Sequence, residues 1–262
     1  TGLTNIEAYT LANGAQTFTL GAASQDVTTG SGAVVIDTGA VVDITDAALD
    51  GSNSTTLTIN VAADTDISDA IITGNLGTQD ANYTIDVAAN ADAITMMIAQ
   101  HALLGTVTDG GDATITLSDA GTVTGNANIG AYALATAGGT TFTLGSDTQS
   151  VTTGTGGADT VDVGTRTATG TFTTIATDTI KLDTGADVQG VDSGAGAGGA
   201  FTANNLSLVS GASVTMTAAQ NNSFSGTITA AGSETITLSD ANAATGLTNI
   251  EAYTLANGAQ TF

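Results

Sequence analysis

The residues of this chain that could do chemistry are almost all aspartates. The sequence holds 25 acidic residues against two basic ones, Arg166 and Lys181, and a single histidine, His101. Of the acids, 22 are Asp and 3 are Glu. Asp favours turns and caps, whereas a charged helical surface favours Glu. Carboxylates in turns can bind a hard cation such as calcium, which takes about six to eight oxygen ligands.

Three stretches hold aspartates close enough in sequence to share a calcium ion. In chain order they contain Asp43, Asp46 and Asp50, then Asp64, Asp66 and Asp69, then Asp159 and Asp162. The candidate metal ligands are Asp159, Asp162, Asp64 and Asp66. The alternative is that each Asp caps its turn through side-chain hydrogen bonds and keeps the surface solvated. The sequence leaves both interpretations open.

The sequence lacks most of the residue types on which catalysis usually depends. The chain has no Cys, and its lone His101 has Asn221 at the matching position of a related segment. No second histidine is present to activate a nucleophile. Carboxylate pairs are common, so a carbohydrate-active β-helix stays an alternative, but Arg166 and Lys181 are isolated on an anionic chain that would repel an acidic sugar. We expect a protein that is not an enzyme.

The charge balance limits the partners. The formal net charge is −23, which disfavours nucleic acids and anionic membrane surfaces because both need basic patches. Divalent cations are the natural partners. No apolar run approaches the length of a membrane span, so we expect no membrane insertion. The chain is 41% hydrophobic with a mean hydropathy of +0.23, which argues against disorder.

The chain repeats itself at two lengths. Residues 1–18, TGLTNIEAYTLANGAQTF, recur unchanged at 245–262, which gives a repeat of 244 residues. Within it, QDVTTG (25–30) matches QSVTTG (149–154), and GDATITLSDA (111–120) matches GSETITLSDA (232–241). We therefore predict two diverged modules, 1–121 and 122–244, followed by the start of a third at 245–262. The interrupted last phrase indicates a segment of a longer polypeptide whose units stack on one another.

Short strands with alternating apolar residues fill each module. TFTLG at 17–21 is typical, because Phe18 and Leu20 face one way and the threonines the other. Evenly spaced strands with polar turns fit a β-sandwich or a β-solenoid. Head-to-tail repetition without linkers, few hairpin turns and the lack of Trp favour an elongated parallel β-solenoid. One short helix is expected per half-repeat, at 95–105 with Thr95 as N-cap and Gly105 as C-cap, and more weakly at 215–226.

The stretch GTGGADTVDVG (154–164) resembles a degenerate RTX nonapeptide, with Gly156, Gly157, Asp159 and Val161 as its glycines, acid and aliphatic residue. In the matching stretch SGAVVIDTG (31–39), Val34 stands at the place of Asp159. The strand phrases resemble those of giant bacterial surface proteins, namely RTX-like S-layer proteins, type I-secreted adhesins and extracellular filaments. The resemblance implies export without disulfides, an extracellular or cell-surface location, and calcium at turns.

These observations predict a structural protein that forms a filament, stalk or surface layer by end-to-end continuation of its solenoid, with copies of itself as partners. The alternative from another class is the repeat stalk of an adhesin whose binding domain lies elsewhere. Threonines flanking an apolar residue recur along the chain, and flat rows of them would suit an ice-binding face. Their spacing in sequence shares no common period, so we do not expect one lattice.

Overall fold

The computed structural model describes residues 1–41, 43–44, 47–52, 56–61, 65–73, 83–87, 93–102, 104, 107, 113–194, 196–258 and 261. The chain divides into two compact units, Thr1–Ser118 and Asp119–Phe262. Both are built from parallel strands stacked as a β-solenoid, with about 11 turns in all and about 5% helix. The predicted all-β, parallel solenoid class is therefore confirmed.

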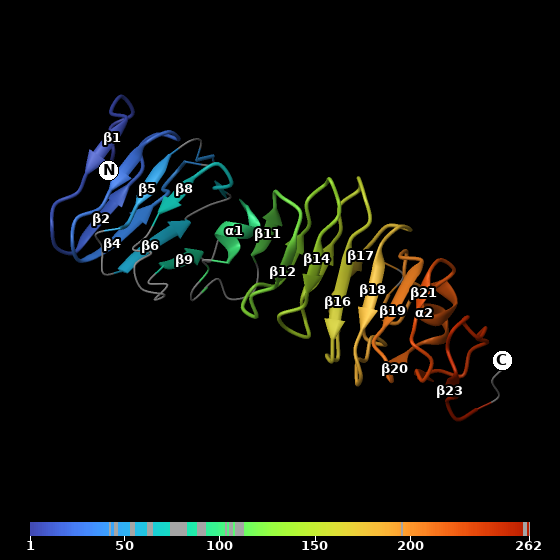
Figure 1. The fold of residues 1–262 in the computed structure, drawn as a ribbon. Helices are drawn as coiled ribbons and strands as arrows, with labels where there is room; N and C mark the ends of the chain where they lie inside the picture. Colours follow the sequence, from blue (N-terminus) through green and yellow to red (C-terminus); the bar gives the residue numbers. More distant parts are fainter. Residues whose placement is uncertain are drawn as a thin grey trace. The chain divides into compact units, whose positions relative to one another are not determined.

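The first unit stacks its strands in three parallel sheets (Figure 1). In most places consecutive strands belong to different sheets, and each strand pairs with one from a neighbouring turn, or coil, of the chain. One sheet holds β1 (Ala8–Thr10), β3 (Asp26–Thr28), β5 (Ala48–Asp50) and β8 (Ile71–Thr73); the second holds β2 (Gln16–Thr19), β4 (Ala33–Asp37), β6 (Thr56–Val61) and β9 (Tyr83–Val87); the third holds β7 (Thr65–Asp66), β10 (Ala93–Met96) and β11 (Thr114–Leu117).

The second unit has the same construction. Its ladders are again parallel, and the longest runs through six strands. That sheet holds β12 (Thr122–Thr124), β14 (Thr141–Thr143), β16 (Thr160–Gly164), β18 (Thr179–Leu182), β19 (Asn205–Leu208) and β21 (Ile228–Thr229); another holds β13 (Ala131–Ala133), β15 (Ser150–Thr152) and β17 (Phe172–Thr173); the last holds β20 (Ser213–Met216), β22 (Thr235–Leu238) and β23 (Ala252–Thr254).

Equivalent apolar residues fill the interior of both units. Phe18 and Phe142 are buried, and each ring lies 4.6 Å from a tyrosine ring, that of Tyr9 and Tyr132 respectively. Such tilted aromatic pairs add to the free energy gained from burial alone. Ile115 and its half-repeat counterpart, Ile236, are fully buried in β11 and β22. Both members of each pair are therefore interior, as expected for half-repeats that share a strand pattern.

The register in the second unit is more regular than we expected from the threonine spacing. Val123, Phe142, Val161 and Ile180 are successive ladder partners 19 residues apart, and all four are buried. The residues just before them form an outward-facing row: Thr122, Thr141, Thr160 and Thr179. The sequence expectation concerned threonines on both sides of an apolar residue, and in this row only Thr122 and Thr141 belong to such a motif, so the row was not predicted.

The two helices are short, as predicted, but begin later than expected. α1 spans Ile98–His101 and α2 spans Ala218–Ser223. The proposed N-cap Thr95 was wrong, because it lies in β10 paired with Thr116, and Met97 occupies the N-cap position instead. Gly105 lies outside the described residues. Among the residues that the structure describes, no helix has the length and apolarity needed to cross a bilayer.

Candidate functional site

Asp159, the first candidate calcium ligand, is turned into the solenoid and is almost fully buried. Its two carboxylate oxygens accept hydrogen bonds from the backbone N–H groups of Thr140 and Gly154, both at 2.8 Å. Its own N–H donates to the carboxylate of Asp178 in the following coil at 2.8 Å. Asp159 therefore ties three segments of the chain together. In the first unit, the register of β2 with β4 puts Val34 at this place, as the sequence comparison predicted.

Asp162, the second candidate, lies on the outer side of β16 rather than beside Asp159. One carboxylate oxygen accepts from the Gly164 N–H at 3.0 Å, and the other from the Lys181 ammonium at 2.6 Å. The hydrogen bond to Asp162 raises the pKa of Lys181. Thr124, Thr143, Asp162 and Lys181 are successive ladder partners, and they form a second outward-facing row, two residues after the first. A charged pair thus interrupts the threonine surface that an ice-binding face would need.

Several of the remaining described aspartates bond to their own turns. Asp66 accepts from the Ser68 N–H at 2.9 Å and from the Ser68 hydroxyl at 2.6 Å, and Asp64 lies outside the described residues. Asp37, Asp50, Asp187 and Asp192 likewise accept from the N–H two residues ahead. Among the described residues, no three His, Cys, Asp or Glu side chains lie close enough to hold a metal ion. Calcium binding stays a prediction.

Glu234 shows the same use of a carboxylate in a more buried setting. Its two oxygens accept hydrogen bonds from the N–H groups of Gly211, Ala231, Gly232 and Ser233 at 2.8–3.2 Å. Burial alone would raise the pKa of this carboxyl, but the four N–H groups outweigh it and lower the pKa to about 2. The side chain closes a turn before β22 and leaves no oxygen turned toward solvent for a substrate.

Four buried glutamines form the recurrent polar feature of the solenoid, and the sequence analysis missed them. Gln149 accepts from the Gly145 N–H at 2.6 Å, and its amide donates to the carbonyls of Asn126 and Ile129, at 2.6 and 3.0 Å, in the preceding coil. Its half-repeat counterpart, Gln25, does the same with Gly21, Leu3 and Ile6. The two carbonyls belong to one tight turn each time, so each glutamine clamps a turn of the coil before it.

The other two clamps sit in the short helices. Gln100 accepts from the Met97 N–H and donates to the Ile67 and Ala70 carbonyls at 2.6 and 2.8 Å. Gln220 accepts from the Thr217 N–H and donates to the Val188 carbonyl at 2.7 Å. The sequence held a signal for all four, because glutamine occupies the same place in both halves of each matched pair. A buried, fully bonded amide costs stability if removed, since its backbone partners lose their bonds.

His101 lies in α1 and is only 7% exposed. Burial lowers the pKa of its imidazole from 6.5 to about 4, so the ring is neutral at physiological pH. Its counterpart in α2 is Asn221, whose amide donates to the Thr245 carbonyl at 2.8 Å. Because an uncharged polar residue serves at both places, the arrangement indicates a structural role for this side chain.

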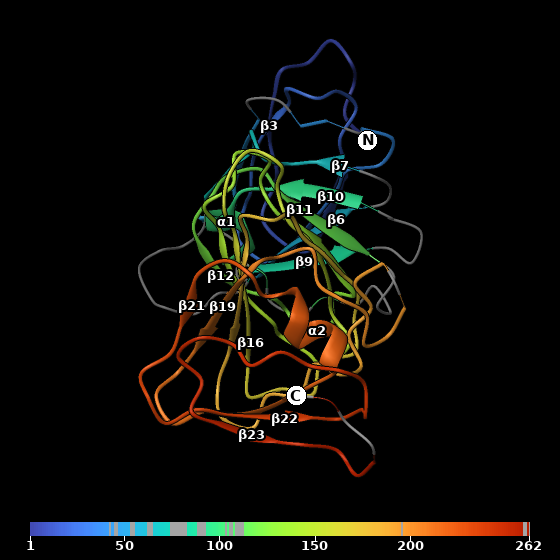
Figure 2. The same ribbon diagram turned by 90° about the vertical axis from the view of Figure 1, so that its right-hand side faces the viewer.

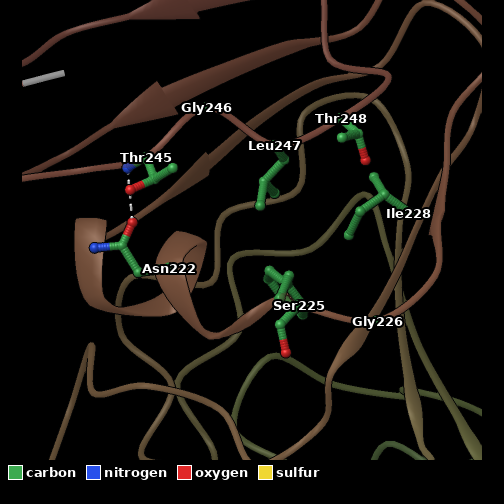
Figure 3. A pocket seen from close by; sticks show the side chains of 9 residues that line it. Asn222, Ser225, Gly226, Ile228, Thr245, Gly246, Leu247 and Thr248 are labelled. Atoms are coloured by element: carbon green, nitrogen blue, oxygen red, sulfur yellow. Dashed lines mark hydrogen bonds between the residues drawn. The ribbon is translucent and has the colours of Figure 1, made fainter.

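The coil after α2 meets the recurring segment 245–262 across a small cavity of about 360 Å³ (Figure 3). The Thr245 N–H donates to the Asn222 side chain at 2.9 Å, and the Asn249 amide donates to the Ile228 carbonyl at 3.0 Å. The lining consists of Asn222, Phe224, Ser225, Gly226, Ile228, Thr245, Gly246, Leu247 and Thr248. None of these residues ionises, so this surface is suited to joining coils rather than to acid–base chemistry.

The chain was compared with protein-family models, with curated proteins and with solved structures, and none of the three comparisons found a match. What the geometry itself provides is a stack of coils joined by parallel ladders, buried aromatic pairs and glutamine clamps. The contacts that bear most on function join the segment 245–262 to the coil that contains α2 and β22.

Proposed function

We propose that this chain is one period of a structural repeat protein whose solenoid continues from each repeat into the next. The observation that carries the proposal is that the recurring segment repeats its local structure. The Tyr9 hydroxyl accepts from the Leu3 N–H at 2.5 Å, and the Tyr253 hydroxyl accepts from the Leu247 N–H at 2.8 Å. Both tyrosines are central in a three-residue strand, β1 or β23.

The joint between repeats is then an ordinary joint between coils. β23 adds to β22 in parallel, with Ile236 opposite Tyr253, and Asn221 and Asn222 hold the segment that leads into β23. Identical residues in 1–18 would begin the same coil in each following repeat. Stability of such an array is the sum of its coils and of the joints between neighbours, so length can grow without a new core.

The acidic composition fits an extended assembly outside the cell. A net charge of −23 keeps neighbouring solenoids apart, and divalent cations would be able to bridge them. Asp159, Asp162 and Glu234 already accept hydrogen bonds from backbone N–H groups, and Asp162 also bonds to Lys181, so we assign the chain no catalytic role. A filament, a stalk or a surface layer on a cell exterior is the setting that we propose, with the stalk of an adhesin as one form of it.

Electron microscopy of chains with one, two and four tandem repeats tests this proposal. We expect particles whose length rises in proportion to the number of repeats while their width stays constant. Repeats that collapse into separate globules joined by visible gaps would overturn it. A variant with a Gly-Ser linker inserted after residue 244 is the matched control, because it keeps every residue but breaks the joint, and it should show the gaps.

A further inference from the structure

The turn between β1 and β2 contains the dipeptide Asn13-Gly14, and it lies against the turn between β3 and β4 in the next coil. Both turns belong to the blue coils near the N label in Figure 2. The Gly14 N–H donates to the Ser31 carbonyl at 2.5 Å, and the side-chain oxygen of Asn13 accepts from the Ser31 N–H at 3.0 Å. The backbone of Ser31 therefore holds both residues of the dipeptide.

The two turns are in close backbone contact. A methyl group on Gly30 would lie 2.5 Å from the Ala12 carbonyl oxygen, and one on Gly32 would lie 2.7 Å from the Gly14 carbonyl carbon. Gly32 also has a φ of +119°, which residues with a Cβ rarely adopt. The contact between the turns therefore leaves no room for an additional backbone atom.

Asparagine followed by glycine is a chemically labile pair. In an open chain the glycine nitrogen attacks the side-chain Cγ of the asparagine, because glycine has no side chain to hinder the approach. A cyclic succinimide forms, and the side-chain nitrogen leaves as ammonia together with the proton of the glycine N–H. Water then opens the succinimide at either carbonyl, which gives aspartate or isoaspartate. The reaction consumes water and needs no other partner.

The hydrogen bonds to Ser31 oppose both movements that this reaction needs. The Gly14 N–H must leave the Ser31 carbonyl before its nitrogen can attack, and the Asn13 side chain must leave the Ser31 N–H to turn its Cγ toward that nitrogen. Both bonds are lost together when the two turns separate, which is a local opening of the fold. In the second half-repeat Thr136 stands in place of Asn13, so the matching turn cannot react in this way.

We propose that Asn13-Gly14 is a site of spontaneous covalent modification, and that stacking of the next coil controls its rate. Aspartate, one product, can still accept from the Ser31 N–H. Isoaspartate, the other product, adds a methylene group to the backbone of a turn that has no room for it. The isoaspartate form therefore cannot restack, so a transient opening becomes a permanent separation of the two turns. This inference goes beyond the proposed function and does not depend on it.

Mass spectrometry of the full chain tests the protection, with peptide mapping to assign the amide-to-acid mass change to Asn13. Asn257→Thr is included in every sample, because Asn257-Gly258 repeats the dipeptide. Gly32→Ala forces a methyl group against Gly14 and should raise the deamidation rate about tenfold or more by opening the joint. Gly185→Ala is the matched control, because it replaces another glycine of positive φ whose Cβ would meet nothing within 4 Å, and it should leave the rate unchanged.

Amide hydrogen exchange gives a second measurement that needs no destabilised variant. The deamidation rate in the folded chain, divided by the rate in unfolding urea, should match the open fraction obtained from exchange of the Gly14 N–H. The purified isoaspartate form should exchange this N–H at nearly the unfolded rate, whereas Asn13→Asp, which has the same charge and a normal backbone, should keep it protected. Deamidation as fast in the folded chain as in urea, equal rates for Gly32→Ala and Gly185→Ala, or a protected isoaspartate form would each overturn the inference.

Discussion

Gly2 is buried and Gly246 is exposed, although each is the second residue of the same 18-residue sequence. Gly2 lies beneath the following coil: its N–H donates to the Thr19 carbonyl at 2.7 Å, and a methyl group on it would collide with the Gln25 side chain. In the described part of the chain no following coil covers Gly246, which is exposed. The environment of the segment is thus determined by the coils on either side of it.

Substitution of these two glycines should lower the free energy of unfolding by unequal amounts. Gly2→Ala forces a methyl group against Gln25 and should lower the free energy of unfolding by about 1–3 kcal/mol. Gly246→Ala should change it by less than about 0.5 kcal/mol, because the site is at the surface. Urea unfolding of the two single variants measures both values. Equal losses of unfolding free energy would contradict the finding that a following coil covers Gly2 but not Gly246.

The glutamine clamps should dominate the polar contribution to stability. Gln149→Ala leaves the Gly145 N–H and the carbonyls of Asn126 and Ile129, which are half-buried or buried, without this partner, which should cost about 3 kcal/mol. Gln189→Ala is the matched control, because that exposed amide bonds only to its own turn at Asp187. Chemical denaturation compares them. A loss for Gln149→Ala no larger than for Gln189→Ala would contradict the clamp.

The fold class was predictable because its signals are local. Alternation in TFTLG, Gly- and Asp-rich turns and unbroken repetition each reflect the backbone geometry of a short strand followed by a turn. The start of α1 was not predictable in this way. Thr95 is a good N-cap by type, but its pairing with Thr116 in the next coil holds it in a strand, and that contact is invisible in a local pattern.

The candidate site was harder to predict, because residue type does not reveal direction. Asp159 and Asp162 are three residues apart in sequence, yet the first bonds to backbone inside the solenoid and the second to Lys181 outside it. Glutamine side chains are usually exposed, so the residue type gave no reason to expect that Gln25 and Gln149 are buried, even though they match in the two half-repeats. Comparison of the half-repeats at polar positions, rather than at apolar ones, would have found them.

Stability should fall in mildly acidic solution through His101. Its pKa is about 4 in the folded chain and 6.5 when exposed, so the unfolded chain binds the proton more tightly. The contribution is complete above about pH 6.5 and is lost progressively as the pH falls toward 4, by up to about 3 kcal/mol. His101→Asn, which copies Asn221, should reduce this slope between pH 6.5 and 4. An unchanged slope in denaturation curves would show that the imidazole is not buried.

Removal of calcium tests directly whether the aspartates bind this ion. Asp159 and Asp162 already use both carboxylate oxygens in hydrogen bonds at 2.6–3.0 Å, so a cation would have to displace those partners. We therefore expect a chelator to move the thermal midpoint by less than about 1 °C at matched ionic strength. A bound ion contributes free energy by linkage. A fall of several degrees that added calcium reverses would instead establish the sequence-based prediction of a calcium site.

The central claim is that repeats stack on one another through the recurring segment, and unfolding of one repeat against two tests it most directly. In a chain where residues 1–244 occur twice before the final 18, the middle copy of the segment gains the neighbours that each terminal copy lacks. We predict one cooperative urea transition for the double repeat, with a midpoint clearly above that of the single repeat, as nearest-neighbour coupling requires. Superimposable midpoints for the two chains would show independent repeats and contradict the account.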